Sequence, residues 1–132
     1  MLNYLEKHKK YLVYLPLFLY WLLILTLTSL PGMDVPNFHI NDKIEHFLAY
    51  GGLGFLLCLS LRIQNKFVIV KKYPALFAIF IVSSYGALDE LHQLFIPGRS
   101  CDILDWSADT IGVIIGVTIM TFLLWAVEKK QA

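Results

Sequence analysis

The sequence is poor in charged residues. Only 16% of its 132 residues are Asp, Glu, Lys or Arg, whereas 58% are hydrophobic. A soluble domain typically holds about 25% charged and about 45–50% apolar residues, so this composition argues against a soluble core. The chain also lacks a Gly/Ser-rich linker, a low-complexity tract and an internal repeat. We therefore expect a single membrane domain over residues 1–132.

Motifs that identify a particular chemistry are also missing. There is no Cys-x-x-Cys pair, zinc-type spacing, Ser-x-x-Lys, Gly-x-Ser-x-Gly or dinucleotide motif, so we predict no cofactor and no metal motif. The two cysteines, Cys58 and Cys101, are expected to lie too far apart for a disulfide. Nucleic acid is excluded as a partner, because the basic residues are scattered beside helix ends.

Four long apolar runs dominate the chain, at about residues 11–30, 44–61, 74–96 and 106–127. Each is close to the roughly 20 residues that a membrane-spanning helix needs. Helices are expected because a bilayer offers no water to satisfy the backbone. We interpret the first run as a retained helix, since it exceeds the roughly 7–15 apolar residues of a signal peptide. The predicted fold is an all-α bundle of four transmembrane helices with short outer loops.

The basic residues predict the orientation of this bundle. Nine of them lie before the first helix, between the second and third, or after the fourth: Lys7, Lys9, Lys10, Arg62, Lys66, Lys71, Lys72, Lys129 and Lys130. Only Lys43 and Arg99 lie on the other side. Because cytoplasmic loops are enriched in Lys and Arg, we expect both termini in the cytoplasm.

The acidic residues have the opposite distribution. Eight of the ten lie toward the outer side: Asp34, Asp42, Glu45, Asp89, Glu90, Asp102, Asp105 and Asp109. The inner end therefore carries a formal charge of +7 and the outer end −6. Topology does not explain this excess, since carboxylates contribute little to the positive-inside rule. Ionisable groups in a membrane domain usually face its interior or a wet cavity, so these acids indicate a functional site.

A polar stripe is expected at the start of the second helix. Asp42, His46 and Tyr50 are spaced by four residues, and Lys43 precedes His46 by three. Residues three and four apart share a helix face, so these side chains should enter the bundle together from outside. Asp42 also has a simpler interpretation, as a helix cap near the positive end of the helix dipole.

A second polar segment begins inside the third apolar run. Glu90 and Gln93 share a helix face, whereas the adjacent Asp89 points about 100° away. Arg99 follows a Pro-Gly turn, and its planar guanidinium suits a carboxylate or the phosphate of a ligand. This segment should face the stripe of the second helix.

The fourth helix continues the segment. Asp105 and Asp109 share a face with Gly112 and Gly116. A Gly-x-x-x-Gly pair allows close helix packing, either within one bundle or between protomers of a homo-oligomer. We expect this helix to pack tightly through its glycines and to present its acids at the outer end.

Together these motifs resemble those of the VanZ-like membrane proteins. The first is Asp42-Lys43-x-x-His46-Phe47-x-x-Tyr50. The second comprises Asp89-Glu90-x-x-Gln93, Pro97-Gly98-Arg99, Asp105 and Asp109-x-x-Gly112. The resemblance covers roughly residues 42–116. One difference is Asp109, which stands where the family usually has Asn; a carboxylate accepts hydrogen bonds but does not donate as an amide does.

The resemblance implies a bacterial protein of the cytoplasmic membrane. It also connects the chain with the cell envelope and with low-level resistance to the glycopeptide teicoplanin. This is a phenotype, and it assigns no reaction.

We hypothesise that the outer residues form a pocket that binds, or also processes, an envelope molecule. Candidate ligands are membrane lipids, a lipid-linked envelope precursor or a glycopeptide. The candidate ligand-binding residues are Asp42, Lys43, His46, Tyr50, Asp89, Glu90, Gln93, Arg99, Asp105 and Asp109. Lys43 and Arg99 could hold phosphate, and His46 and Glu90 are the catalytic candidates, as base and acid.

Two alternatives stay open. In the first, the polar groups only hold the helices together, with Arg99 paired to Glu90 or Asp105. Eight outer acids and two permanent cations would then leave several carboxylates unpaired, which argues against this alternative. The second is a metal-dependent membrane enzyme, whose possible ligands are His46, His92, Glu90, Asp105 and Asp109.

Overall fold

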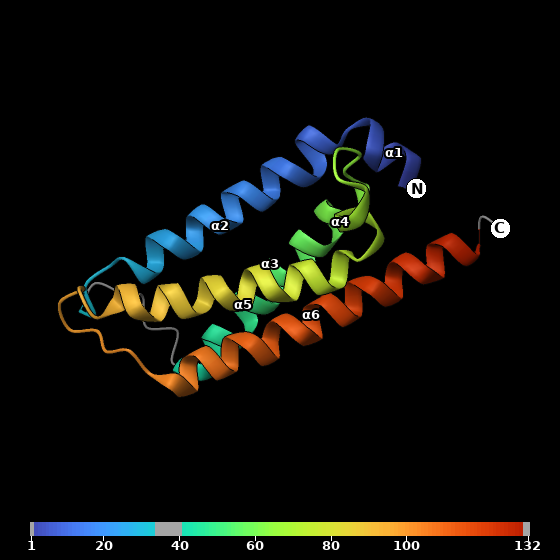
Figure 1. The fold of residues 1–132 in the computed structure, drawn as a ribbon. Helices are drawn as coiled ribbons and strands as arrows, with labels where there is room; N and C mark the ends of the chain where they lie inside the picture. Colours follow the sequence, from blue (N-terminus) through green and yellow to red (C-terminus); the bar gives the residue numbers. More distant parts are fainter. Residues whose placement is uncertain (1, 34–40, 131–132) are drawn as a thin grey trace.

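The structure, a computed structural model, describes residues 2–33 and 41–130. Every regular element in these ranges is helical, and Figure 1 shows them in chain order: α1 (Leu2–Lys7), a π-helical segment (Lys10–Tyr14), α2 (Leu15–Thr28), α3 (Asp42–Ile63), α4 (Val68–Lys72), α5 (Pro74–Gln93) and α6 (Ile103–Lys129). Four stretches are long and apolar enough to cross a membrane: Lys10–Thr28, α3, α5 and α6. The predicted all-α fold with four transmembrane helices is confirmed.

Two of these helices begin earlier than expected, because capping residues precede their apolar runs. The side chain of Asn41 accepts a hydrogen bond of 3.0 Å from the backbone N–H of Lys43, so α3 begins two residues early. Asp102 does the same for Leu104 at 2.8 Å, and α6 begins three residues early. These acceptors satisfy N–H groups that a helix leaves unpaired at its start.

Prolines shape two other helix ends. α5 ends at Gln93, three residues before its expected end, because a turn leads into Pro97 and a residue before proline avoids the helical conformation. Near the start of the first span, the N–H of Leu15 donates to the carbonyl of Lys10 in a π turn. The ring of Pro16 would clash with a carbonyl four residues earlier in a regular helix, and the wider π turn carries the chain past it.

α3 lies at the centre of the bundle and contacts α2, α5 and α6. α3 and α6 run side by side in the same direction (Figure 1). A Cβ atom at Gly112 would overlap the carbonyl oxygen of Phe47, and one at Gly116 would overlap that of Gly51. The Gly-x-x-x-Gly face of α6 therefore packs against α3 of the same chain. A homo-oligomer stays a prediction, and it would need another surface.

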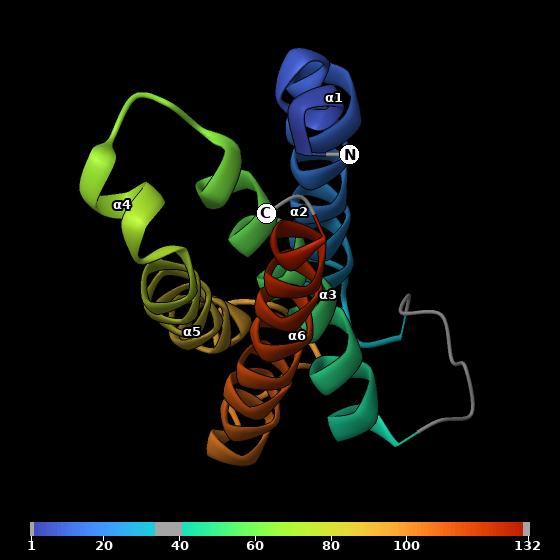
Figure 2. The same ribbon diagram turned by 90° about the vertical axis from the view of Figure 1, so that its right-hand side faces the viewer.

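The bundle has two chemically different ends. α1, α4 and the C-terminal end of α6 lie together at one end, which we call the basic end (Figures 1 and 2). The two acids there are both paired: Glu6 lies 3.2 Å from Lys71, and Glu128 contacts Arg62. The connection from α5 to α6 lies at the opposite end, the acidic end.

Candidate functional site

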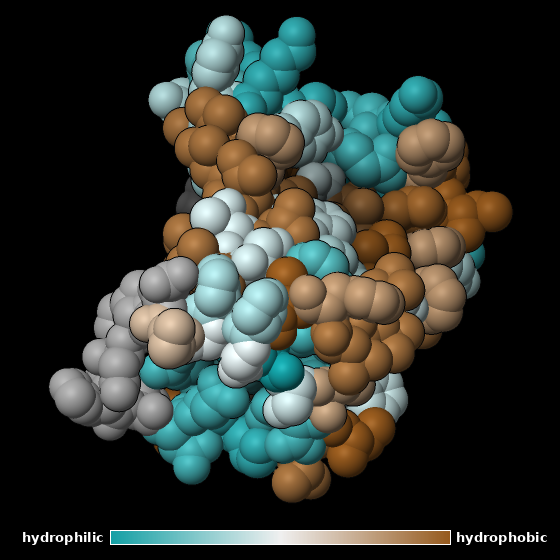
Figure 3. Space-filling view, turned by 90° about the vertical axis from the view of Figure 1, so that its left-hand side faces the viewer, coloured by the Kyte–Doolittle hydropathy of each residue, from teal (hydrophilic) through white to brown (hydrophobic). Residues whose placement is uncertain are grey.

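The acidic end gathers seven carboxylates among the residues that the structure describes: Asp42, Glu45, Asp89, Glu90, Asp102, Asp105 and Asp109. Four of them are buried, with exposed fractions of 3% for Asp89 and Glu90, 7% for Asp105 and 0% for Asp109. Figure 3 looks at this end and shows hydrophilic residues gathered beside hydrophobic surface. Asp34, which the sequence also assigns to the outer acids, lies outside the described residues.

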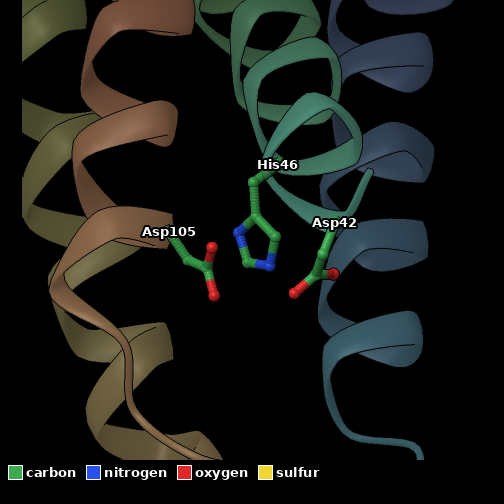
Figure 4. Close-up of side chains that lie close together, drawn as sticks. All are labelled: Asp42, His46 and Asp105. Carbon is green, nitrogen blue, oxygen red and sulfur yellow. The ribbon is translucent and has the colours of Figure 1, made fainter. Parts of the chain in front are cut away.

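His46 of α3 lies among these acids and is only 8% exposed. Its Nδ1 lies 2.9 Å from Oδ1 of Asp109 on α6. Since a carboxylate only accepts, Nδ1 donates the proton, and Nε2 of the neutral imidazole then has a free lone pair. Asp105 and Asp42 lie on either side of the ring (Figure 4). The predicted meeting of the α3 stripe with the acids of α6 is thus seen in the structure.

Two sets of three side chains around His46 could hold a metal ion. The ligand atoms of Asp42, His46 and Asp105 all lie within 4.8 Å of one another, and so do those of His46, Glu90 and Asp109. The sets join residues from separate helices. This explains why their spacing in the sequence matches no metal motif.

Glu90 of α5 connects the cluster to the loop before α6. Its Oε2 accepts a hydrogen bond of 2.8 Å from the backbone N–H of Asp102. Its Oε1 lies 3.9 Å from Nδ1 of His46 and has no hydrogen-bond partner within the described ranges. Oδ2 of Asp109 is likewise without a partner there. Two buried carboxylate oxygens of the cluster therefore lack a donor within the described part of the chain.

Asp89, although adjacent to Glu90, has a different environment. Tyr50 of α3 donates a hydrogen bond of 2.8 Å to Oδ2, and Thr28 of α2 donates one of 2.8 Å to Oδ1. The ring of Tyr50 also stacks with that of His46, with centroids 6.2 Å apart. Asp89 therefore joins three helices, which is the role that the structural alternative assigns to it.

Lys43 likewise has partners within the chain. Its Nζ lies 2.8 Å from Oδ1 of Asp105 and 3.1 Å from Oδ2 of Asp102. Two hydrogen bonds hold the pKa of Asp102 below its usual range. The larger effect comes from the N–H of Leu104, and the next from Lys43. Lys43 thus helps to fix the start of α6 against α3.

Arg99 lies apart from the acids that the sequence offered it as partners. Its guanidinium donates to the backbone carbonyls of Leu27 at 3.2 Å and Leu30 at 3.5 Å, at the C-terminal end of α2. Within the described part of the chain it forms no ion pair with an acid. Pairing of Arg99 with Glu90 or Asp105, as the structural alternative supposed, is therefore wrong. A cation near the carbonyls at the C-terminal end of a helix is favourable by itself.

The turn before Arg99 needs its glycine. Gly98 has a φ of +75°, a conformation that other residues rarely adopt. The N–H of Gly32 donates a hydrogen bond of 3.0 Å to the carbonyl of Pro97, so the segment after α2 docks on this turn. Pro97 and Arg99 of the Pro-Gly-Arg motif therefore connect the end of α2 to the α5–α6 turn.

An apolar groove between α5 and α6 leads to the cluster. One pocket, of about 300 Å³, is lined by Ala87, Glu90, Leu91, Cys101, Asp102, Ile103 and Trp106. A second, of about 460 Å³, shares Ala87 and Trp106 and continues along α5 to Leu76. Together they extend over roughly 22 Å at 1.5 Å per helical residue. The groove begins among exposed apolar residues and ends at Glu90.

Several residues of this arrangement were not expected from the sequence. Thr28 and Ala87 lie in apolar runs and carry no signal of their role. Trp106, whose indole N–H donates a hydrogen bond of 3.0 Å to the carbonyl of Ser83, bridges α5 and α6. Gln93 was expected at the site and is 3% exposed, with its Nε2 unpartnered among the described residues. The one feature of the sequence that could have indicated these positions is a polar residue, such as Ser83, inside an apolar run.

A family model described as VanZ/LLP1 matches residues 4–125 of the chain. Comparisons with curated proteins and with solved structures found no match. The family match extends beyond residues 42–116, which carry the motifs, to the first apolar helix.

Proposed function

The chain belongs to the VanZ/LLP1 family, and from that premise we propose that it binds a membrane lipid or a lipid-linked envelope precursor at its acidic end. In this proposal it is a multi-pass protein of the bacterial cytoplasmic membrane. The basic end faces the cytoplasm, as the positive-inside rule favours, and the acidic end faces outward.

The observation that carries the proposal is the groove between α5 and α6. Its walls include side chains that are largely exposed in the isolated chain, such as Phe80 at 70% and Ile103 at 68%. In a membrane these residues face acyl chains. The groove is longer than half of the roughly 30 Å hydrocarbon core, so it can accept the chain of a lipid from one leaflet.

The polar end of the groove favours a head group that donates hydrogen bonds. Glu90 lines the pocket at this end, and its carboxylate accepts hydrogen bonds but does not donate them. Arg99, one of the two residues expected to hold phosphate, instead donates to a backbone carbonyl in the last turn of α2 and to one just after it. Sugar hydroxyls or an ammonium group complement such a site better than a bare phosphate does.

A glycopeptide is a weaker candidate for the direct ligand. The pocket beside Glu90 measures about 300 Å³, at the lower limit of small-molecule sites. A glycopeptide antibiotic is far larger. We therefore propose that teicoplanin-type resistance, where this chain confers it, follows from changes in envelope lipids or precursors.

Processing of the bound head group is a second candidate function. His46 lies next to Glu90, with Nδ1 3.9 Å from Oε1; Nδ1 donates to Asp109, so the basic nitrogen is Nε2, and Glu90, which lines the groove, would act as the acid. This geometry supports His46 and Glu90 as the catalytic candidates. Binding of the lipid is required in both cases.

Photocrosslinking tests the proposal. A phospholipid with a diazirine in its acyl chain is added to membranes that contain the protein, and adducts are mapped by peptide mass spectrometry. We expect adducts concentrated on residues 76–91 and 103–110. Ala87→Phe fills the groove and should lower these adducts at least fivefold.

Leu88→Phe is the matched control, because it introduces the same ring on the neighbouring residue. Leu88 is 65% exposed and does not line either pocket. Its variant should give the wild-type pattern. Adducts spread evenly over all four helices, or an Ala87→Phe pattern equal to wild type, would contradict the groove as the binding site.

A further inference from the structure

We propose that His46, Asp42 and Asp105 form a site for a divalent transition-metal ion at the acidic end. Their ligand atoms lie within 4.8 Å of one another. Asp42 begins α3, His46 follows one turn later, and Asp105 comes from the first turn of α6 (Figure 4). Zinc and manganese ions both accept imidazole and carboxylate ligands, at about 2.0–2.2 Å for zinc.

The orientation of His46 supports this role. Its Nδ1 donates to Asp109, which fixes the ring and leaves Nε2, the ring nitrogen nearer Asp42 in Figure 4, without this bond. Histidines that bind metals almost always donate their other ring N–H to a carboxylate or carbonyl in this way. Asp109 is completely buried, so it serves as a support for His46 and not as an exposed ligand.

The charge of the surrounding groups requires compensation. Lys43 is the one permanent cation in ion-pair contact with these acids among the described residues, and it already lies between Asp102 and Asp105. For the buried Glu90 and Asp109, His46 is the one basic side chain within ion-pair distance among the described residues. Buried charges in proteins are normally paired or coordinate metals. A divalent ion bound by His46 would balance this excess.

Glu90 provides an independent indication of a ligand. It is 97% buried, and its Oε1 has no hydrogen-bond partner in the described ranges although it faces His46. A carboxylate oxygen in this position gains from a nearby cation or from a donor on a metal-bound ligand. Three protein ligands also leave coordination positions open on the ion.

Metal titration of the detergent-solubilised protein tests this inference. The protein is treated with EDTA, and ZnCl2 and MnCl2 are titrated in separate calorimetric experiments. We expect one saturable site per chain for at least one of the two ions. Asp42→Asn should weaken binding at least tenfold, because it replaces a charged ligand on an exposed residue without disturbing the core.

Glu45→Gln is the matched control. Glu45 lies in the same first turn of α3 and carries the same charge, but it belongs to neither ligand set. Its variant should bind as wild type does. Co²⁺ added to wild type and to His46→Gln gives a second readout, since its visible absorption changes when a histidine nitrogen is lost.

The absence of a saturable site for both ions would overturn the inference, and so would equal weakening by Asp42→Asn and Glu45→Gln. These titrations need no lipid, so their outcome is independent of the proposed function. Loss of lipid crosslinking in Ala87→Phe with unchanged metal binding would support both proposals separately.

Discussion

Adjacent acids on one helix can have different roles, as α5 shows. Each carboxylate oxygen of Asp89 accepts a hydrogen bond, from Tyr50 or Thr28, whereas one oxygen of Glu90 has no donor in the described part of the chain. The roughly 100° between successive helical residues directs the first toward α2 and α3 and the second toward His46. At the scale of single residues, the candidate site therefore contains carboxylates that hold the helices together and carboxylates that keep an oxygen free to bind a ligand.

Tyr50→Phe tests the structural role of Asp89. The substitution leaves one oxygen of a buried carboxylate without its donor, and we expect a loss of about 1–3 kcal/mol in the free energy of unfolding. Denaturation in mixed micelles, followed by tryptophan fluorescence, measures this. Tyr85→Phe is the control, because the Tyr85 hydroxyl has no hydrogen-bond partner among the described residues. Equal destabilisation by both variants would argue against the Tyr50–Asp89 bond as the cause.

Substitutions of Asp109, which stands where the family usually has Asn, test whether its hydrogen-bond acceptor or its charge stabilises the fold. Asp109→Asn retains an oxygen that can accept from Nδ1 of His46, so the unfolding free energy should stay within about 1 kcal/mol of wild type. Asp109→Ala leaves Nδ1 unpaired and should cost about 1–3 kcal/mol. The same unfolding assay applies. If Asn destabilises as much as Ala, the negative charge, and not the acceptor, is what α6 contributes.

At this scale the sequence predicted the meeting of His46 with acids of α6, because helical spacing assigns residues to faces. It could not predict the partners of Arg99 and Lys43. Those depend on where the ends of α2 and α6 lie relative to the neighbouring helices. Periodicity within one helix does not contain that information.

At the scale of the elements, the ends of helices matter more than their apolar centres. The apolar runs predicted all four spans, since length and hydropathy suffice for that. The starts of α3 and α6 were displaced because Asn41 and Asp102 cap them. The short helices α1 and α4 were not predicted, since neither has the length or the apolar composition of a span.

Arg99→Ala tests the connection between α2 and the α5–α6 turn. It removes the donors to Leu27 and Leu30, and we expect a loss of about 1–2 kcal/mol in unfolding free energy. Lipid crosslinking by the folded protein should not change. Arg99→Lys keeps the charge near the helix end but not the planar fork, so it should fall between wild type and Ala. Unchanged stability with lost crosslinking would instead restore a phosphate-binding role for Arg99.

At the scale of the whole molecule, opposite charge at the two ends gives a testable orientation. Cys101 is exposed at the acidic end, and Cys58 is buried. A membrane-impermeant maleimide added to intact cells should label Cys101 without permeabilisation. Cys101→Ser should abolish this labelling. Labelling of wild type only after the membrane is opened would reverse the proposed orientation.

Cluster and groove come together only in the folded bundle. His46, Glu90 and Asp109 belong to three helices, and the groove between α5 and α6 is bounded by residues that look like ordinary lipid-facing positions in the sequence. The sequence therefore predicted an acidic site but not its connection to the groove between α5 and α6. That connection is the basis of the proposed function.

The most direct test is native mass spectrometry of the protein released from mild detergent. We predict that wild type and Leu88→Phe retain a lipid or lipid-linked molecule in about a one-to-one ratio, and that Ala87→Phe retains at least fivefold less. Fragmentation of the complex then identifies the head group. Wild type that carries no more bound lipid than Ala87→Phe would contradict the account of the groove as a lipid site.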